Sequence, residues 1–408
     1  MRQKRTTAAE ATPIKVAIIT LENHLRGVIL NAGERQQQEL PGLALSMHAA
    51  SNWDGDSASL AACHQDIASA DIIVVTMLFF DHHIKAVHEQ LAARRDDCDA
   101  MICCMSAAEV MKLTRMGRFS MDGEARGPMA LLKRLRGKSK NSKQAAGAQQ
   151  LSILRQLPRI LRFIPGTAQD LRVYFLTLQY WLAASEDNVC SMVLFLVDRY
   201  AAGPREVLRG RVKAGSPIEY PETGLYHPRL KGRISTRAKA LPAPKDTHRG
   251  TIGMLVMRSY ALAGNTAHYD AVITALEQRG FRVIPAFASG LDARPAVNEF
   301  FMDEGRPIID AMLSLTGFSL VGGPAYNDAD AAEELLASLD VPYVTAQPLE
   351  FQSVNQWEDS TQGLTPLEST MMVAIPELEG ATGSIVFGGR YSDCLLYTSD
   401  AADDLYTV

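Results

Sequence analysis

Apolar runs alternate with amphipathic stretches through the first hundred residues. KVAIITL (Lys15–Leu21) and DIIVVTMLF (Asp71–Phe79) are apolar on both faces, as strands buried on two sides are. LALSMHAA and DAMICCMS are further strand candidates. The segments between them, residues 24–40, 57–70 and 82–97, have helical spacing. Strands that alternate with helices indicate a parallel sheet covered on both faces, so we expect an N-terminal α/β domain over residues 15–125.

The pattern changes after Met105. Residues 126–204 read as a basic linker followed by helices at 151–164, 168–184 and 186–201, with Thr167 and Ser185 as candidate N-caps. Residues 205–250 are rich in proline and turn residues and show no periodicity, which predicts an extended inter-domain connection.

A second α/β region is expected over residues 251–393. Its expected strands are 251–259, 281–289, 318–323, 341–346 and 384–389; its expected helices are 266–280, closed by Gly280, 306–315 and 328–340. Residues 1–14 read as a flexible tail. The predicted fold class is therefore α/β: two parallel-sheet units separated by a helical segment and an extended linker.

Composition limits the cellular setting. The chain is 47% hydrophobic and 21% charged, and an apolar run such as MVLFLV (Met192–Val197) is far shorter than the roughly 20 residues that span a bilayer. No apolar stretch follows the basic start, so we expect no secretory signal, no transmembrane segment and a cytoplasmic location. Six cysteines without a framework spacing fit a reducing compartment.

Charge is unevenly distributed. Between Glu124 and Asp170 there are ten Lys or Arg and no acid, whereas from Glu299 to the end nineteen acids face two arginines. A basic arm can bind nucleic acid or a membrane surface. Here glycine, serine and glutamine interrupt LLKRLRGKSKNSKQAAGAQQ and no aromatic is available for base stacking, so we favour a solvated linker and expect no nucleic-acid partner.

Short motifs exclude some chemistries. GxGxxG and GxxxxGK[ST] are both absent, so no fingerprint supports nucleotide binding by this chain. His82, His83 and His88 lie on one expected helix, but their spacing is not the i,i+4 of metal-binding pairs, which favours exposed histidines. Cys103 and Cys104 are adjacent on a strand and read as buried small hydrophobes.

Candidate binding residues lie where strands end and helices begin. VGGPAYNDAD contributes Gly322, Gly323, Tyr326 and Asn327, and ligands of open α/β sheets favour this carboxyl end. A plain strand-to-helix turn, with Asn327 or Asp328 as cap, is the alternative. Arg258 follows an earlier strand in the same way; it could meet a carboxylate or stay solvated.

Four carboxylates follow in the acidic part of the chain. Glu350, Glu368, Glu377 and Glu379 could bind a hard cation such as Mg²⁺, but nothing in the sequence brings them together, so we favour solvated acids. Glu350 joins the candidate substrate-binding residues. We assign no catalytic residue and no metal ligand.

Long stretches of the chain resemble one known family. LVGGPAYNDADAAEELLASLDVPYVTAQPLEFQSVNQW and GLTPLESTMMVAIPELEGATGSIVFGGR closely resemble the large H subunit of magnesium chelatase, whose family includes the cobaltochelatase large subunit. KVAIITLENHLRG, DIIVVTMLFFDHH and YPETGLYHP are similar to the N-terminal region of the same subunit. The resemblance runs from about Lys15 to Arg390, and the opening IKVAIITLENH favours the magnesium branch.

The resemblance implies a porphyrin-binding subunit of a ligase that forms nitrogen–metal bonds. In this family the H subunit holds protoporphyrin IX, and Mg²⁺ is inserted while two AAA+ type partner subunits hydrolyse ATP. The product leads to chlorophyll or bacteriochlorophyll. Family members are much longer, and this chain resembles about their first third. The catalytic residues are therefore expected in the remaining part, and this chain alone is expected to be inactive.

Two other functions stay open at this point. One is a cobaltochelatase-type subunit of cobalamin synthesis, and the other is a non-catalytic porphyrin-binding or docking module. The C-terminal CLLYTSDAADDLYTV (Cys394–Val408) reads like the translation of a transposon-end adaptor used for sequencing libraries. We therefore expect residues 394–408 to be adaptor-derived rather than native, and the second α/β region to be cut short.

Overall fold

Two compact units, residues 1–219 and 220–408, make up the chain. The computed structural model describes residues 12–21, 23–53, 56–121, 157–243, 248–323, 326–349 and 351–389, and for residues 323 and 326 it describes the backbone alone. Most of the predicted N-terminal tail, most of the basic linker and the 394–408 segment lie outside the described residues.

The first unit is an α/β domain. Its elements are β1 (Ile14–Thr20), α1 (Arg26–Gln36), β2 (Leu43–Ala49), η1 (Ala50–Asn52), α2 (Ser57–Ser69), β3 (Ile72–Thr76), α3 (Asp81–Arg94), β4 (Ala100–Cys104), α4 (Ala108–Met111), β5 (Arg115–Met116), β6 (Phe119–Ser120), α7 (Thr167–Leu182), α8 (Glu186–Tyr200) and η2 (Gly203–Leu208).

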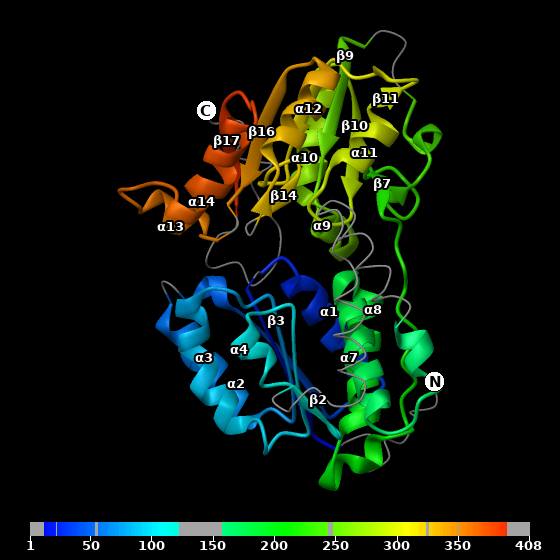
Figure 1. Ribbon diagram of the computed structural model, residues 1–408, viewed down its shortest axis with the longest axis vertical. Coiled ribbons are helices and arrows are strands. Elements are labelled where there is room, and N and C mark those ends of the chain that lie inside the picture. Colours follow the sequence, from blue (N-terminus) through cyan, green and yellow to red (C-terminus); the bar gives the residue numbers. More distant parts are fainter. Residues whose placement is uncertain are drawn as a thin grey trace, which may run out of the picture. The chain divides into compact units, whose positions relative to one another are not determined.

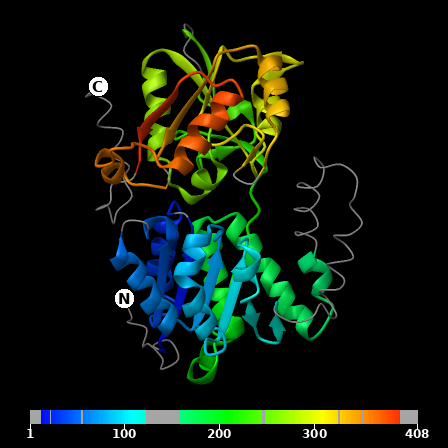
Figure 2. The ribbon, with the colours of Figure 1, turned by 60° about the vertical axis from the view of Figure 1, so that its left-hand side comes forward.

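Its sheet has the strand order β2-β1-β3-β4-β5-β6, in which β1 to β4 are parallel and β5 and β6 antiparallel. Helices α2 and α3 cover one face, and α1 and α8 lie together on the other (Figures 1 and 2). Every residue of β3 and β4 is buried, as expected for strands covered on both sides.

The predicted helical segment packs on this first sheet. Buried Asp170 of α7 accepts hydrogen bonds from the Arg118 backbone N–H at 3.0 Å and from the Tyr200 hydroxyl at 3.1 Å. The Tyr174 hydroxyl donates to the carbonyl of Cys103 at 3.3 Å. Ser185 caps α8 as predicted, whereas α7 begins at Thr167 itself with Gly166 in the cap position. The helices are thus an integral layer of the first unit.

The second unit is built in the same way. Its elements are β7 (Thr223–Tyr226), β8 (Ile234–Ser235), η3 (Ala238–Ala240), β9 (Gly250–Leu255), α9 (Arg258–Ala263), α10 (Ala267–Gln278), β10 (Phe281–Ala288), α11 (Arg294–Phe300), β11 (Met302–Asp303), β12 (Arg306–Pro307), β13 (Ala311–Ser314), β14 (Gly322–Gly323), β15 (Tyr326–Asn327), α12 (Ala329–Leu339), β16 (Tyr343–Pro348), α13 (Val354–Glu358), α14 (Pro366–Glu368), the π-helix η4 (Ser369–Ala374), α15 (Ile375–Leu378) and β17 (Ser384–Gly388).

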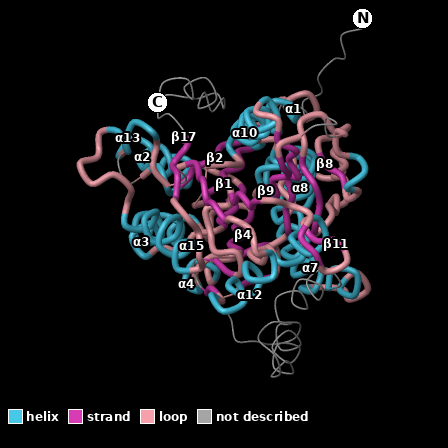
Figure 3. Tube along the Cα trace, turned by 90° about the horizontal axis from the view of Figure 1, so that it is seen from above, coloured by secondary structure: helices cyan, strands magenta, loops and turns pink. Residues whose placement is uncertain are grey.

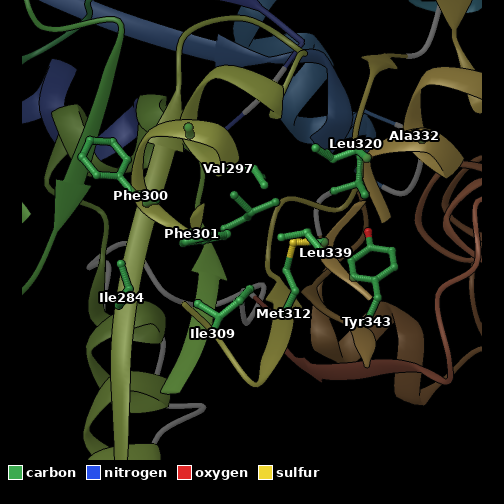
Figure 4. Close-up of a cluster of buried hydrophobic side chains, with 14 of the residues drawn as sticks. Ile284, Val297, Phe300, Phe301, Ile309, Met312, Leu320, Ala332, Leu339 and Tyr343 are labelled. Carbon is green, nitrogen blue, oxygen red and sulfur yellow. The ribbon is translucent and has the colours of Figure 1, made fainter. Parts of the chain in front are cut away.

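The second sheet has the order β17-β16-β13-β9-β10-β7-β8. Strands β9, β10, β13, β16 and β17 run parallel, and β7 and β8 extend the sheet antiparallel. Helix α10 lies on one side, and α12 and α15 lie on the other (Figure 3). On the α12 side, Phe301, Met312 and Tyr343 belong to the larger apolar cluster (Figure 4). The predicted fold class is confirmed by these two parallel-sheet units.

One contact recurs at the amino edge of both sheets. The Asp71 carboxylate, just before β3, accepts from the Lys15 backbone N–H at 2.8 Å. The Asp310 carboxylate, just before β13, accepts from the Thr251 backbone N–H at 2.7 Å. In each unit, therefore, an aspartate just before the third parallel strand holds the second residue of the first parallel strand. Arg205 adds an ion pair to Asp71 at 3.2 Å in the first unit.

Three predictions for the second half of the chain are wrong. The predicted helix 306–315 forms β12 and β13, because Ile309 and Met312 enter the core while Asp310 is held by β9. Of the predicted strand 318–323, the structure keeps only Gly322–Gly323. The 205–250 connection contains β7 and β8, which join the second sheet.

A glycine in the β5–β6 turn should be sensitive to substitution. Gly117 has φ +58°, and a Cβ there would lie 2.8 Å from both carboxylate oxygens of Asp170. We expect Gly117→Ala to destabilise the first unit by about 2 kcal/mol or more, through backbone strain and displacement of Asp170. Urea denaturation followed by tryptophan fluorescence measures the loss.

Gly33→Ala in α1 is the matched control. Its Cβ would meet the side chain of Leu45 at 3.5 Å, an ordinary contact, and alanine favours a helix over glycine by up to about 1 kcal/mol. Equal unfolding midpoints for the two variants would contradict the assigned role of Gly117.

Candidate functional site

The strand order of the second sheet locates its candidate binding edge. Taken in chain order, its five parallel strands have the flavodoxin-like arrangement 2-1-3-4-5, with β9 first and β17 last. Ligands of such sheets bind outside the carboxyl ends, where the order reverses. Here that point lies between β9 and β13, so the loops after these two strands form the candidate site.

Arg258 begins α9 directly after β9. Its guanidinium donates to the carbonyl of Pro221 at 2.9 Å and to that of Tyr220 at 3.2 Å. The preceding Met257 N–H donates to the Tyr269 hydroxyl at 3.1 Å. Arg258 therefore ties the segment that leads into β7 to the carboxyl edge, a structural contact that the sequence did not indicate.

The glycine pair forms a short hairpin. Gly322 pairs with Asn327 and Gly323 with Tyr326, as β14 and β15. Gly322 has φ 138°, a value that favours glycine. Figure 1 shows β14 and α9 at the same end of the second unit. The structure thus brings Arg258 and the hairpin to one edge, on loops that follow the neighbouring strands β9 and β13.

The hairpin is anchored at its base. The Gly322 N–H donates to the carbonyl of Leu291 at 2.6 Å, and the Ala293 N–H donates to that of Leu320 at 2.8 Å. The Asp328 carboxylate caps α12 by accepting from the Ala331 N–H at 3.2 Å, as one of the two predicted caps. The hairpin is thus held between the loop after β10 and the start of α12. The side chain of Tyr326 and all of Glu350 lie outside the described residues.

Two of the four candidate carboxylates are buried. Glu379 is 2% exposed; it accepts from the Ser319 hydroxyl and from the Leu320 N–H, the latter at 3.0 Å. It therefore fixes the loop that leads into the hairpin. Glu377 is exposed.

Glu368 is fully buried and surrounded by donors. It accepts from the backbone N–H groups of Phe351 and Gln352 at 3.1 and 3.2 Å, and from the Thr365 hydroxyl at 2.8 Å. The prediction of solvated acids is therefore wrong for Glu368 and Glu379, because internal donors replace water. These donors also occupy the oxygens that Mg²⁺ would need. The described residues contain no group of three or more potential metal ligands.

A buried histidine beside this edge was missed by the sequence reasoning. His268, in the first turn of α10, is 6% exposed and packs edge-on against Tyr260 and stacked over Phe387, with ring centroids 5.5 and 6.3 Å away. Burial lowers the pKa of His268 to about 4, so the ring is neutral at pH 7. It links α9, α10 and β17 as an aromatic core residue.

Two other groups of potential ligands in the first unit are structural. Burial raises the pKa of both the Cys103 and Cys104 thiols, the latter to about 12, which confirms that these cysteines are buried hydrophobes and inert at pH 7. His83 is buried against Trp53 with centroids 5.8 Å apart, so the prediction of exposed histidines is wrong for this residue. Helix α3 thus places His83 against Trp53, the residue that follows η1.

Within the described ranges, every helix is too short or too polar to cross a membrane. The fold defines a doubly wound α/β protein, and the carboxyl end of its second sheet is the candidate binding edge.

A model described as CobN/Magnesium Chelatase matches residues 178–405, and a model described as a domain of unknown function (DUF3479) matches residues 15–175. The first of these covers more than half of the chain. The chain belongs to the CobN/magnesium chelatase family.

The curated relatives include two bacterial magnesium-chelatase H subunits. The chain is 50% identical over 376 residues to that of Cereibacter sphaeroides and 52% identical over 376 residues to that of Rhodobacter capsulatus. Each alignment covers 92% of this chain and 31% of the relative, so the chain spans about a third of their length. A solved structure, the catalytic subunit of cobaltochelatase from Mycobacterium tuberculosis, aligns with 97% of this chain and 27% of that one, with 17% identity and a TM-score of 0.46.

Substituting Glu368 tests its structural role. Glu368→Gln removes the charge that these donors stabilise and turns an amide NH₂ toward them. We expect the second unit to lose about 2 kcal/mol of unfolding free energy. Exposed Glu377→Gln is the control and should change it by less than about 0.5 kcal/mol. Urea unfolding monitored by Trp357 fluorescence distinguishes the two, and equal effects would show that Glu368 is not held as described.

His268 gives the second unit a pH dependence. In the unfolded chain the ring binds its proton near pH 6.5, and in the folded chain near pH 4. The unfolded chain therefore binds more protons between these values, so stability falls as the pH drops through this window, by up to about 3 kcal/mol below pH 4. His268→Phe should remove this loss, measured as the difference in urea midpoint from pH 7 to 4. The exposed His248→Phe variant should keep it; a wild-type-like slope in His268→Phe would disprove the assignment.

Proposed function

We propose that this chain is the amino-terminal part of the porphyrin-binding H subunit of a magnesium chelatase. The complete ligase inserts Mg²⁺ into protoporphyrin IX in the synthesis of chlorophyll or bacteriochlorophyll, with ATP hydrolysed by two AAA+ type partner subunits in the cytoplasm. One observation supports this most: identity of 50% and 52% to two magnesium-chelatase H subunits extends over 92% of the chain, through both structural units.

The candidate contact region for the porphyrin is the carboxyl edge of the second sheet. Arg258, Gly322, Gly323, Tyr326, Asn327 and Glu350 all follow carboxyl ends of its parallel strands. The glycine hairpin allows a flat ligand to approach the backbone closely. Asn327 is exposed and could donate to a propionate group.

Metal insertion requires a base for the pyrrole protons and a carboxylate or imidazole that delivers Mg²⁺. The buried groups beside the edge do not meet this need, because Glu368 and Glu379 are occupied by internal donors and His268 lies within an aromatic cluster. We therefore assign insertion to the part of the longer subunit that this chain does not span, and porphyrin contact to this part.

A chimera tests the proposal. Residues 15–389 of this chain replace the aligned region of the Rhodobacter capsulatus H subunit, and the product is assayed for Mg-protoporphyrin formation with the partner subunits and ATP. We expect activity within about tenfold of the parent, because about half of the residues are identical. Asn327→Ala in the chimera should raise the KM for porphyrin, whereas Glu333→Ala on the exposed side of α12 should not.

A folded chimera that binds the partner subunits but forms no product would overturn the proposed function. Activity with cobalt and a corrin-type substrate, without activity on protoporphyrin IX, would favour the cobaltochelatase alternative. An unchanged KM in Asn327→Ala would remove the hairpin from the binding site while leaving the proposed function standing.

A further inference from the structure

The second sheet is covered unevenly. In the first unit every residue of the third and fourth parallel strands, β3 and β4, is buried. In the second unit the corresponding strands β13 and β16 alternate between buried and half-buried residues. Parallel sheets are normally covered on both faces. One face of β13 and β16 therefore has less cover than the fold requires.

The half-covered residues all point to one side. Leu313, Ala346 and Phe387 pack at the margin of the apolar cluster that contains Met254 and Tyr269 of the α10 side. Strand register adds Val344, the partner of Leu313, and Ile385, the partner of Ala346. Ile385 is 53% exposed. We call these five residues, Leu313, Val344, Ala346, Ile385 and Phe387, the open face.

The opposite side of the same strands is fully packed. Met312 and Tyr343 lie against α11 and α12 and are at most 3% exposed. On the side of the open face, α10 packs against β10, and its first turn also meets β17, where His268 stacks over Phe387. One side of β13 and β16 is buried and the other carries half-exposed apolar residues. We therefore interpret the second side as lacking part of its helical layer, rather than as a polar surface.

The first unit shows what completes such a layer. Its strand order β2-β1-β3-β4 corresponds to β10-β9-β13-β16, and the aspartate contact at the amino edge recurs in both. There α8 lies beside α1: the Gln36 side chain donates to the carbonyl of Cys190, and the Cys190 thiol lies 3.8 Å from the carbonyl of Ala32. Helix α10 corresponds to α1, and the position of α8 is the open face.

We propose that the open face receives an amphipathic helix that packs beside α10, as α8 packs beside α1, and that this helix comes from the segment that follows β17 in the longer H subunits. All five residues of the open face are apolar, so the fitting surface is an apolar helix stripe rather than a charged partner. Because β17 is the edge strand and lies next to β16, a short turn after it suffices to bring a helix back across β16 and β13.

The relatives are long enough to supply such a helix, because the aligned region is only 31% of each of them. His268 marks the border of the site, because its contact with Phe387 joins α10 to β17 where the helix would begin. The inference rests on the sheet and on family membership, not on the proposed activity.

Cysteine labelling tests the proposal. Ile385→Cys is placed in the full chain, with Cys394→Ser in the background, and in the chimera described above, where the relative's own segment follows β17. The five cysteines among the described residues are all buried. We expect maleimide to modify position 385 rapidly in the full chain and at least about tenfold more slowly in the chimera, as read by mass spectrometry of the peptide that contains it.

Leu378→Cys is the matched control. Leu378, at the end of α15, is 76% exposed and should react equally fast in both proteins. Equal rates for position 385 in both proteins would overturn the proposal. Slow labelling of the full chain together with a dimeric mass by light scattering would overturn it in favour of a second copy. Labelling does not depend on activity, so a chimera that binds the partner subunits, forms no product and protects position 385 would refute the proposed function and still support this inference.

Discussion

The need to cover a parallel sheet on both faces governs the whole structure. Strands that hydrogen-bond only to parallel neighbours present apolar side chains on both sides, and each side needs a layer of helices to exclude water. In the first unit both faces of the sheet are covered, by α2 and α3 on one face and by α1 and α8 on the other. Helices α7 and α8, distant in sequence from β1 to β4, are held to the sheet by this requirement rather than by their own helix propensity.

This constraint also explains what the sequence could predict. Continuous apolar runs such as Ile72–Thr76 identified the strands of the first unit, since burial on both faces leaves no room for polar residues. The same reasoning failed over 306–315, where Ile308 and Ile309 are consecutive and the period alone does not separate a short strand from a helix. Strand β7 was missed because its four residues, TGLY, are stabilised by pairing with β10 and carry no local signal of their own.

The places of the candidate residues on the fold were predictable from the sequence, and their contacts were not. Strand-to-helix order placed Gly322 and Arg258 at carboxyl ends from sequence alone. Most hydrogen-bond partners of Arg258, Glu368 and Glu379 lie in segments distant along the chain, and no sequence pattern predicts these contacts. One local signal was available: Thr365 and Glu368 have the T-x-x-E spacing of a capping box, and both capping contacts are present. That spacing would have identified Glu368 as a structural carboxylate.

The aspartate contacts at the amino edges of the two sheets affect the order in which the chain folds. Asp71 closes onto Lys15 across 56 residues, and Asp310 closes onto Thr251 across 59, each within its own unit. Arg205 ties the first unit further by hydrogen bonds to Asp99, 106 residues away. Such distant pairings form slowly, because loop closure must precede the contacts that stabilise it. A chain emerging from the ribosome can therefore complete its first unit only after residue 205 is available.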